Sequence, residues 1–318
     1  MLNKKLIINI LGVLLIIESF FIFLTAGISE YFNDNDFWAF CISGIIALTL
    51  GCIAFFSTRK APRVIHQREG YIIVSLVWIV FAAFGCLPYV LGSQQQSIVN
   101  AFFETMSGFT TTGISVFSDV ESLPYSLLFW RSLTQWIGGM GIIVMSLAIL
   151  PFLNIGGMQL FAAEVPGVSY IKLTPKLKGT AVRLWLMYTF FTALEALLLK
   201  LSGMATFDAI CHAMTTMASG GFSTKNDNIA YYSSPQIQYI IIAFMFFAGV
   251  NYTITYYVLS FQFSKLLRNE EFFYYVIFIL FFTFTLFVIL LQISKPIEET
   301  FRLALFSTVS VITTTGFI

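Results

Sequence analysis

Long apolar runs separated by shorter polar connections dominate the chain. A helix needs about 20 apolar residues to cross the ~30 Å hydrocarbon core of a bilayer. Seven runs are that long, at residues 6–28, 36–57, 71–92, 125–150, 181–203, 236–263 and 272–293. The first run contains Glu18 and lacks a clean signal-peptide cleavage site, so we expect it to be retained as a helix. The pattern predicts an all-α integral membrane protein.

Three of the connections contain a short, half-apolar stretch followed by a run of Thr, Ser and Gly. Stretches this short cannot span a bilayer, so they predict re-entrant pore helices that enter the membrane and stop. The expected pore helices are about 98–109, 206–217 and 298–312, and the filter segments that follow them are 110–114, 218–222 and 313–317.

These three stretches are copies of one another. Gly113, Gly221 and Gly316 occupy the same place in each copy, 108 and then 95 residues apart. Internal duplication of this kind is common in transporters and governs the fold. We predict tandem repeats of outer helix, pore helix, filter and inner helix around a central pore. The predicted units are two N-terminal transmembrane helices at 1–58, pore repeat 1 at 71–150, a cytoplasmic linker at 151–180, pore repeat 2 at 181–268 and pore repeat 3 at 270–318.

The filter segments have the composition that a carbonyl-lined cation filter needs. Backbone carbonyls replace a cation's hydration shell without adding net charge, and glycine reaches the positive φ that such a strand requires. Small hydroxyl residues add oxygens, and the C-terminal end of a pore helix favours a cation. The segments contain no carboxylate, which favours a monovalent ion. The predicted ion-binding residues are Thr110, Thr111, Thr112, Gly113, Ala218, Ser219, Gly220, Gly221, Thr313, Thr314, Thr315 and Gly316.

Composition argues against several other classes of protein. Hydrophobic residues make up 58% of the chain and charged residues only 10%, too few to cover a soluble globule of 318 residues. A net charge of +1 would not attract nucleic acid. The 4 cysteines form no Cys-x-x-Cys pair and there are only 2 histidines, so we expect no disulfide scaffold, no zinc site and no cofactor.

Lysine and arginine are distributed unequally between the two sets of connections. One set carries Lys4, Lys5, Arg59, Lys60, Arg63, Arg68, Lys172, Lys176, Lys178, Arg183, Lys265 and Arg268, whereas the other carries Lys225, Lys295 and Arg302. The positive-inside rule places the first set and the N-terminus in the cytoplasm. The outer side is rich in acids, which either reflects that rule or concentrates cations at a pore mouth.

Three charged residues lie inside the apolar runs. Arg131 either pairs with an outer acid, such as Glu104 or Asp119, or sets the potential near the pore. For Glu18 and Glu195 we expect structural pairing, with proton or sodium coupling as the alternative.

Two inner helices carry residues that are unusual in a membrane span. The small residues Gly138, Gly139 and Gly141 either allow close helix packing or make a flexible point in the pore lining. The polar Asn251 either lines the cavity or bonds to a neighbouring helix.

Several sequence motifs run through the whole chain. They are Phe109-Thr110-Thr111-Thr112-Gly113, Gln135-Trp136-Ile137-Gly138-Gly139-Met140-Gly141-Ile142-Ile143-Val144, Ala163-Glu164-Val165-Pro166-Gly167, Lys172-Leu173-Thr174-Pro175, Gly220-Gly221-Phe222-Ser223-Thr224 and Thr313-Thr314-Thr315-Gly316-Phe317. With these motifs the chain resembles the Trk/Ktr/HKT superfamily of potassium transporters, and its TrkH branch in particular.

The resemblance implies a fold of four repeats around one pore, preceded by two further helices. It places potassium at the twelve filter residues of a multi-pass protein in the cell (inner) membrane. It also implies a homodimer and a cytosolic regulatory subunit that is TrkA-like and binds nucleotides. In the HKT branch, serine at the first filter glycine accompanies sodium permeation, so glycine at all three positions here favours potassium.

The resemblance also shows a departure at the C-terminus. The third inner helix and the fourth repeat are missing from the sequence. An open pore would expose carbonyls to lipid. We therefore expect the chain to be a truncated piece, or to be completed by a second polypeptide.

Our main functional hypothesis is potassium uptake through a channel-like filter, without enzyme activity or catalytic residues. A proton- or sodium-coupled potassium symporter is the alternative. A membrane-embedded enzyme that acts on lipid-linked substrates is a remote alternative, because the sequence shows no convergent acids or histidines on an inner helix face.

Overall fold

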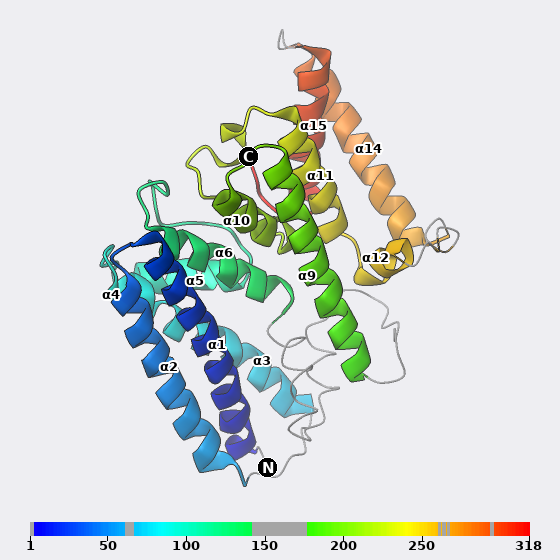
Figure 1. Ribbon diagram of the computed structural model, residues 1–318. Helices are drawn as coiled ribbons and strands as arrows, with labels where there is room; N and C mark the ends of the chain where they lie inside the picture. Colours follow the sequence, from blue (N-terminus) through cyan, green and yellow to red (C-terminus); the bar gives the residue numbers. More distant parts are fainter. Residues whose placement is uncertain are drawn as a thin grey trace.

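A computed structural model describes residues 3–60, 67–141, 177–259, 262, 265, 268–292 and 296–318. In this part of the chain every regular element is a helix (Figure 1). Long helices surround shorter ones, and non-helical segments meet near the middle of the molecule. The fold class is therefore all-α, as predicted.

The chain begins with a hairpin of two long helices, α1 (Lys4–Phe32) and α2 (Phe37–Thr58). It reverses at Asn33, which caps α1 with a left-handed φ of 53°. The helices cross where two glycines face each other, because a Cβ on Gly12 would lie 2.9 Å from the carbonyl oxygen of Gly51. Small residues permit such close backbone approach between helices in a membrane.

The turn of this hairpin is fixed to the outer connections of the first repeat. Asp34 accepts the amide of Ser126 at 2.9 Å, and Asp36 accepts the amide and the hydroxyl of Ser93 at 2.6 and 3.2 Å. Burial raises the pKa of Asp36, whereas its bonds from Ser93 act in the opposite direction. The hairpin, which belongs to no repeat, thus supports repeat 1 from outside.

Repeat 1 consists of an interrupted outer helix, a pore helix and an inner helix. They are α3 (Gln67–Gly85) with α4 (Leu87–Leu91), α5 (Ile98–Phe109) and α6 (Tyr125–Gly139). The outer helix is interrupted at Cys86, since Pro88 in the first turn of α4 has no amide hydrogen to continue the ladder. The pore helix α5 packs between α3 and α6.

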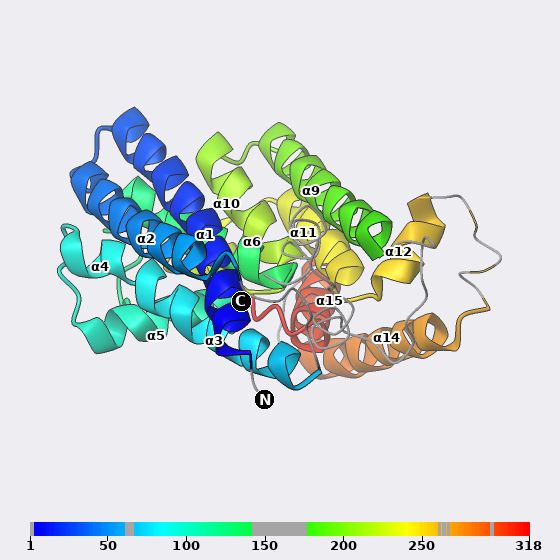
Figure 2. The same cartoon turned by 90° about the horizontal axis from the view of Figure 1, so that it is seen from below.

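Repeats 2 and 3 follow the same order. Repeat 2 has α9 (Leu177–Leu201), α10 (Thr206–Met217), the 3₁₀ helix η2 (Asn228–Tyr231), α11 (Pro235–Ala248) and α12 (Tyr252–Leu259), and repeat 3 has α14 (Glu270–Leu290) and α15 (Ile297–Ile312). The pore helix α10 packs against α6 of repeat 1, and α15 packs against α11 of repeat 2. The C-terminus lies near the centre of the view in Figure 2.

The three pore helices confirm the sequence prediction almost to the residue. Among the described residues, five helices are long and apolar enough to cross a membrane, and they correspond to five of the predicted runs: Lys4–Phe32, Phe37–Thr58, Glu69–Leu91, Val182–Leu201 and Glu270–Leu290. In α6, the helix stops at Gly139, and residues 142–150 of the predicted run lie outside the described residues. The same holds for the motifs at 163–167 and 172–175 and for the predicted linker up to residue 176.

The prediction of one continuous span at 236–263 is wrong. The helix α11 ends at Ala248, and α12 begins at Tyr252. At the break Gly249 lies against the third filter segment, because a Cβ there would lie 2.6 Å from Cγ2 of Thr313. The Asn251 carbonyl then accepts the first amides of α12. Hydropathy does not reveal this break, since apolar residues continue on both sides of it.

The crossing of α1 and α2 gives a test of the packing. Replacing Gly12 with leucine should push the helices apart, because even a Cβ would lie 2.8 Å from the backbone nitrogen of Phe55. We expect a loss of roughly 1–3 kcal/mol in the free energy of unfolding, measured as a lower unfolding temperature in detergent. Gly27→Leu is the matched control, since a Cβ on Gly27 meets nothing within 4 Å. Equal unfolding temperatures for the two variants would contradict the packing described here.

Candidate functional site

Each pore helix ends in the same hydrogen-bonded turn directly before its filter segment. The amide of the third residue of the segment bonds to the pore-helix carbonyl five residues earlier. The three bonds are Thr112 to Ser107 at 2.9 Å, Gly220 to Thr215 at 2.9 Å and Thr315 to Ser310 at 3.0 Å. This pattern closes a helix in the manner of a Schellman turn. The three copies recognised in the sequence therefore have the same local structure.

Two residues of each filter segment have a left-handed backbone. The glycines singled out in the sequence, Gly113, Gly221 and Gly316, have φ values of 77°, 74° and 77°. Two residues earlier, Thr111, Ser219 and Thr314 have φ values of 53°, 52° and 57°. A non-glycine residue in this region costs about 1–2 kcal/mol, so contacts around the turn must hold it there. Sequence reasoning included these three residues in the filter but missed their left-handed backbone, because Thr and Ser carry no signal for it.

The filter segments of successive repeats lie directly against each other. A Cβ on Gly113 would collide with the carbonyl oxygen of Gly220, and a Cβ on Gly221 would collide with the carbonyl oxygen of Thr315. Repeat 1 thus contacts repeat 2, and repeat 2 contacts repeat 3. The structure brings all twelve predicted residues together in three adjoining turns. Glycine is required at Gly113 and Gly221 both for its positive φ and for the close approach of the next filter segment.

Threonine hydroxyls brace two of the three turns. The hydroxyls of Thr110 and Thr112 lie 2.8 Å apart, and those of Thr313 and Thr315 also lie 2.8 Å apart. Thr110 donates to the Met106 carbonyl, and Thr313 donates equivalently to the Val309 carbonyl. These hydroxyls therefore bond within the protein, whereas the sequence suggested them as additional oxygens for an ion. Repeat 2 has Ala218 and Gly220 in their place.

A glutamine from the neighbouring inner helix braces the turn of repeat 2 instead. The Gln135 side chain is fully buried in α6; its Nε2 donates to the Gly220 carbonyl at 2.7 Å, and its Oε1 accepts the Phe222 amide at 3.1 Å. One amide group thus satisfies a donor and an acceptor of the filter backbone. Gln135 belongs to a motif noted in the sequence, but its role was missed, because its partners lie 85 and 87 residues away along the chain.

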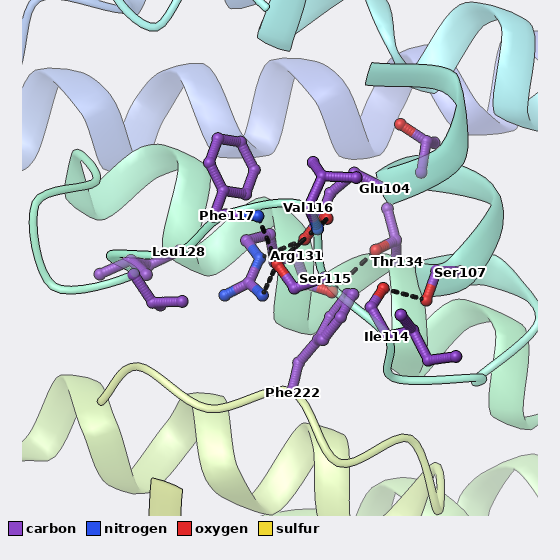
Figure 3. A network of polar contacts seen from close by, with 12 residues as sticks. Glu104, Ser107, Ile114, Ser115, Val116, Phe117, Leu128, Arg131, Thr134 and Phe222 are labelled. Atoms are coloured by element: carbon purple, nitrogen blue, oxygen red, sulfur yellow. Dashed lines mark hydrogen bonds and ion pairs between the residues drawn. The ribbon is translucent and has the colours of Figure 1, made fainter. Parts of the chain in front are cut away.

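A buried ion pair lies beside the outer ends of the first two segments (Figure 3). Arg131 Nε lies 2.8 Å from Glu104 Oε1, and the two side chains are only 2% and 0% exposed. Glu104 also accepts the Ser115 hydroxyl and the Val116 amide, which lie just beyond the first filter. Of the two partners weighed for Arg131, Glu104 is therefore the correct one.

Repeat 2 makes the same connection with a neutral residue. His212 occupies in α10 the position of Glu104 in α5, and its Nε2 lies 3.0 Å from the hydroxyl of Ser223. Its Nδ1 lies 2.8 Å from the Asp208 carbonyl oxygen, which can only accept. Nδ1 therefore carries the proton, and Nε2 accepts from Ser223. In both repeats a pore-helix side chain holds the serine two residues after the filter glycine.

A cavity of about 280 Å³ lies at the C-terminal ends of α10 and α15. Ala218 and Thr313 line it from the filter segments, and Asn251 lines it from the break between α11 and α12. Gly139 and Gly249 also line it, and a Cβ on either would lie 2.6 Å from an atom of Ala218 or Thr313, respectively. The glycines therefore serve close packing, and the helix ends give the cavity a partial negative charge.

The outer connections of repeats 1 and 2 are tied by Asn226. Its side-chain amide donates to Asp119 at 2.8 Å and accepts the Val120 amide at 2.7 Å, while its backbone amide bonds to Glu121 at 3.1 Å. The bond from Asn226 lowers the pKa of Asp119. The acids of these connections, Asp119 and Glu121, thus join the two repeats.

The pairing expected for Glu18 and Glu195 is wrong for the described part of the chain. Both side chains are buried; the carboxyl oxygens of Glu18 have no hydrogen-bond partner there, and the polar group beside the Glu195 carboxyl is the hydroxyl of Thr216, which is not a basic group. The immediate neighbours of the Glu18 carboxyl group are not basic. A Cβ on Gly85 would lie 3.0 Å from Glu18 Oε1 and 2.9 Å from the methyl group of Thr105.

Comparison with known proteins places this geometry in a family. The family model TrkH, described as cation transport protein, matches residues 38–315. The chain is 39% identical over 316 residues to the Trk system potassium uptake protein TrkH of Escherichia coli K12, an alignment that covers 98% of this chain and 65% of the relative. The corresponding Vibrio parahaemolyticus protein is 37% identical over 319 residues, with 98% and 66% coverage.

A solved structure has the same fold. The crystal structure of the potassium transporter TrkH from Vibrio parahaemolyticus aligns with a TM-score of 0.85 and 33% identity, over 99% of this chain and 66% of that chain. The chain thus spans about two thirds of the length of the relatives it matches. The family model, the identities and the shared fold together establish that the chain belongs to the TrkH family of cation transport proteins.

Proposed function

We propose that the protein takes up potassium across the cell membrane through a carbonyl-lined filter. The observation that carries the proposal is the direct contact between three equivalent turns. Gly113 lies against the carbonyl oxygen of Gly220, and Gly221 lies against the carbonyl oxygen of Thr315. Such turns present peptide oxygens in place of an ion's water shell. The relatives are named as potassium uptake proteins, and glycine at all three filter positions supports potassium rather than sodium.

We assign ion binding to the backbone of the twelve filter residues. The pore helices end at these residues, so their partial negative charges stabilise a cation. Glu271 of α14 also lines the cavity at these helix ends. The Gly220 carbonyl oxygen already accepts a hydrogen bond from Gln135, which weakens it as an ion ligand. A potassium ion would cross singly, dehydrated between carbonyls, and enter the cavity beside Asn251.

The proposal extends to the setting of the protein. By the positive-inside rule, the basic connections support a cytoplasmic N-terminus, and we propose a location in the cell (inner) membrane. From the family resemblance we propose a homodimer that docks on a cytosolic, nucleotide-binding regulator of the TrkA type. The division of the chain into two N-terminal helices, three pore repeats and a linker stays a prediction. Its bounds are 1–58 for the helices, 71–150, 181–268 and 270–318 for the repeats, and 151–180 for the linker.

Uptake of radioactive rubidium into liposomes tests the function. With the complete gene product reconstituted, we expect uptake that potassium blocks at low concentration and sodium blocks poorly, without an imposed proton gradient. Uptake that requires a proton or sodium gradient would support the coupled symporter instead. Growth of a potassium-uptake-deficient bacterium on low potassium is the cellular counterpart, and no rescue despite good expression would contradict the proposal.

Serine at a filter glycine should weaken discrimination against sodium. In Gly113→Ser and Gly221→Ser the new Cβ collides with the next segment, so we expect the potassium-to-sodium preference to fall by about tenfold or more. Gly203→Ser is the matched control, because Gly203 also has a positive φ, of 96°, but meets nothing within 4 Å. Competition of sodium with rubidium uptake measures the effect. Unchanged preference in both filter variants would refute the filter assignment.

Removing the amide of Gln135 should also impair the filter. Gln135→Met leaves the Phe222 amide and the Gly220 carbonyl without a partner, and an unsatisfied buried group costs about 1–3 kcal/mol. We expect the potassium preference to drop roughly tenfold in the same competition assay. Gln238→Met is the control, because Gln238 bonds to Tyr232 and Arg302 and reaches no filter residue. A larger loss in the control would argue against this role of Gln135.

A further inference from the structure

Arg131 contacts the ends of two filter segments at once (Figure 3). Its Nη2 donates to the hydroxyl of Ser115 at 3.1 Å, and its Nη1 donates to the carbonyl oxygen of Ser223 at 3.2 Å. These serines lie two residues beyond Gly113 and Gly221, respectively. One rigid guanidinium therefore spans from repeat 1 to repeat 2 at the outer side of the filter.

The guanidinium is held from its other sides as well. Its Nε lies 2.8 Å from Glu104, and its carbon atom lies 4.2 Å from the centroid of the Phe222 ring, directly after the second filter. A cation over an aromatic face is attracted by the ring's quadrupole. Glu104 balances the charge, so the network is neutral overall and fixes both segments relative to α5 and α6.

The fold itself does not require a charge at this place. The inner helices α6 and α11 are equivalent parts of repeats 1 and 2. Gly139 of α6 corresponds to Gly249, which follows α11, because each contacts the first residue of the next filter segment. In that alignment Ile241 of repeat 2 corresponds to Arg131, and it is fully buried. An apolar side chain thus fills the equivalent position. Filling space between the helices therefore does not explain why repeat 1 has an arginine at position 131.

We propose that Arg131 is a positioning residue that sets the separation of the first two filter segments at their outer ends and thereby determines ion discrimination. The proposal rests on the potassium uptake proposed above. Arg131 does not touch the ion. It acts through Ser115, Ser223 and Phe222, whose positions fix the first filter carbonyls that an entering cation meets.

Two variants of the complete gene product test this role. The double variant Arg131→Met with Glu104→Gln removes the bridge without leaving a lone buried charge, which alone would destabilise the fold. Arg131→Lys keeps the charge next to Glu104, but a single ammonium does not reproduce the planar fork that reaches Ser115 and Ser223 together. We expect both to fold and to lose about tenfold or more of the potassium-to-sodium preference, the size of effect that loss of buried charged hydrogen bonds produces.

Arg302 provides the matched control. It is also a buried, ion-paired arginine, bonded to Glu298 at 2.7 Å and to Gln238 at 2.8 Å, but it reaches no filter residue among those described. We expect Arg302→Met to keep the wild-type preference at equal amounts of folded protein, as judged by size-exclusion chromatography in detergent.

The outcomes separate this proposal from the proposed function. If the wild-type protein takes up no potassium, the function itself is wrong. If the wild type is selective and both Arg131 variants fold with unchanged preference, only the role of Arg131 is refuted. An equal loss in Arg302→Met would also refute it, because the effect would then be a general consequence of losing a buried arginine.

Discussion

Peptide groups that leave a helix inside a membrane have no water to bond to, and the rest of this structure depends on meeting that constraint three times. Each pore helix stops near the middle of the molecule, and the following turn takes a left-handed backbone at two positions. The first partner is always the pore helix itself, through bonds such as Thr112 to Ser107. The remaining groups need partners from elsewhere, which explains why polar side chains in apolar helices point at the filter.

The three repeats meet the constraint with different chemistry. Repeat 1 uses a pair of threonine hydroxyls and the Glu104–Arg131 ion pair. Repeat 2, which has no such hydroxyls, uses Gln135 from the preceding repeat and a neutral histidine. The threonine pairs, Glu104 and His212 brace turns of their own repeat. Gln135 and Arg131 reach from repeat 1 into repeat 2, so the first two filter turns are not independent loops. The backbone turn is therefore the same in all three repeats, whereas the side chains that brace it differ between repeats 1 and 2.

This difference also explains what the sequence could predict. The pore helices and the filter glycines follow from local pattern, because helix length, glycine and the repeat are all visible along the chain. The left-handed backbone of Thr111 was missed because threonine carries no signal for that conformation. The role of Gln135 was missed because its partners lie 85 and 87 residues away along the chain. The break after Ala248 was missed because close contact with Thr313, and not a change in hydropathy, interrupts the helix. The pairing expected for Glu18 failed, since its carboxyl oxygens have no hydrogen-bond partner in the described part of the chain.

The central claim is that backbone oxygens of three adjoining turns coordinate a monovalent cation. Crystals of the complete gene product grown in rubidium or thallium would test it most directly, because both ions replace potassium and scatter anomalously. The account predicts anomalous peaks in a line between the segments that contain Gly113, Gly221 and Gly316, within coordination distance of their carbonyls. Peaks only at the outer acids or in the cavity beside Asn251, with none between the segments, would contradict it.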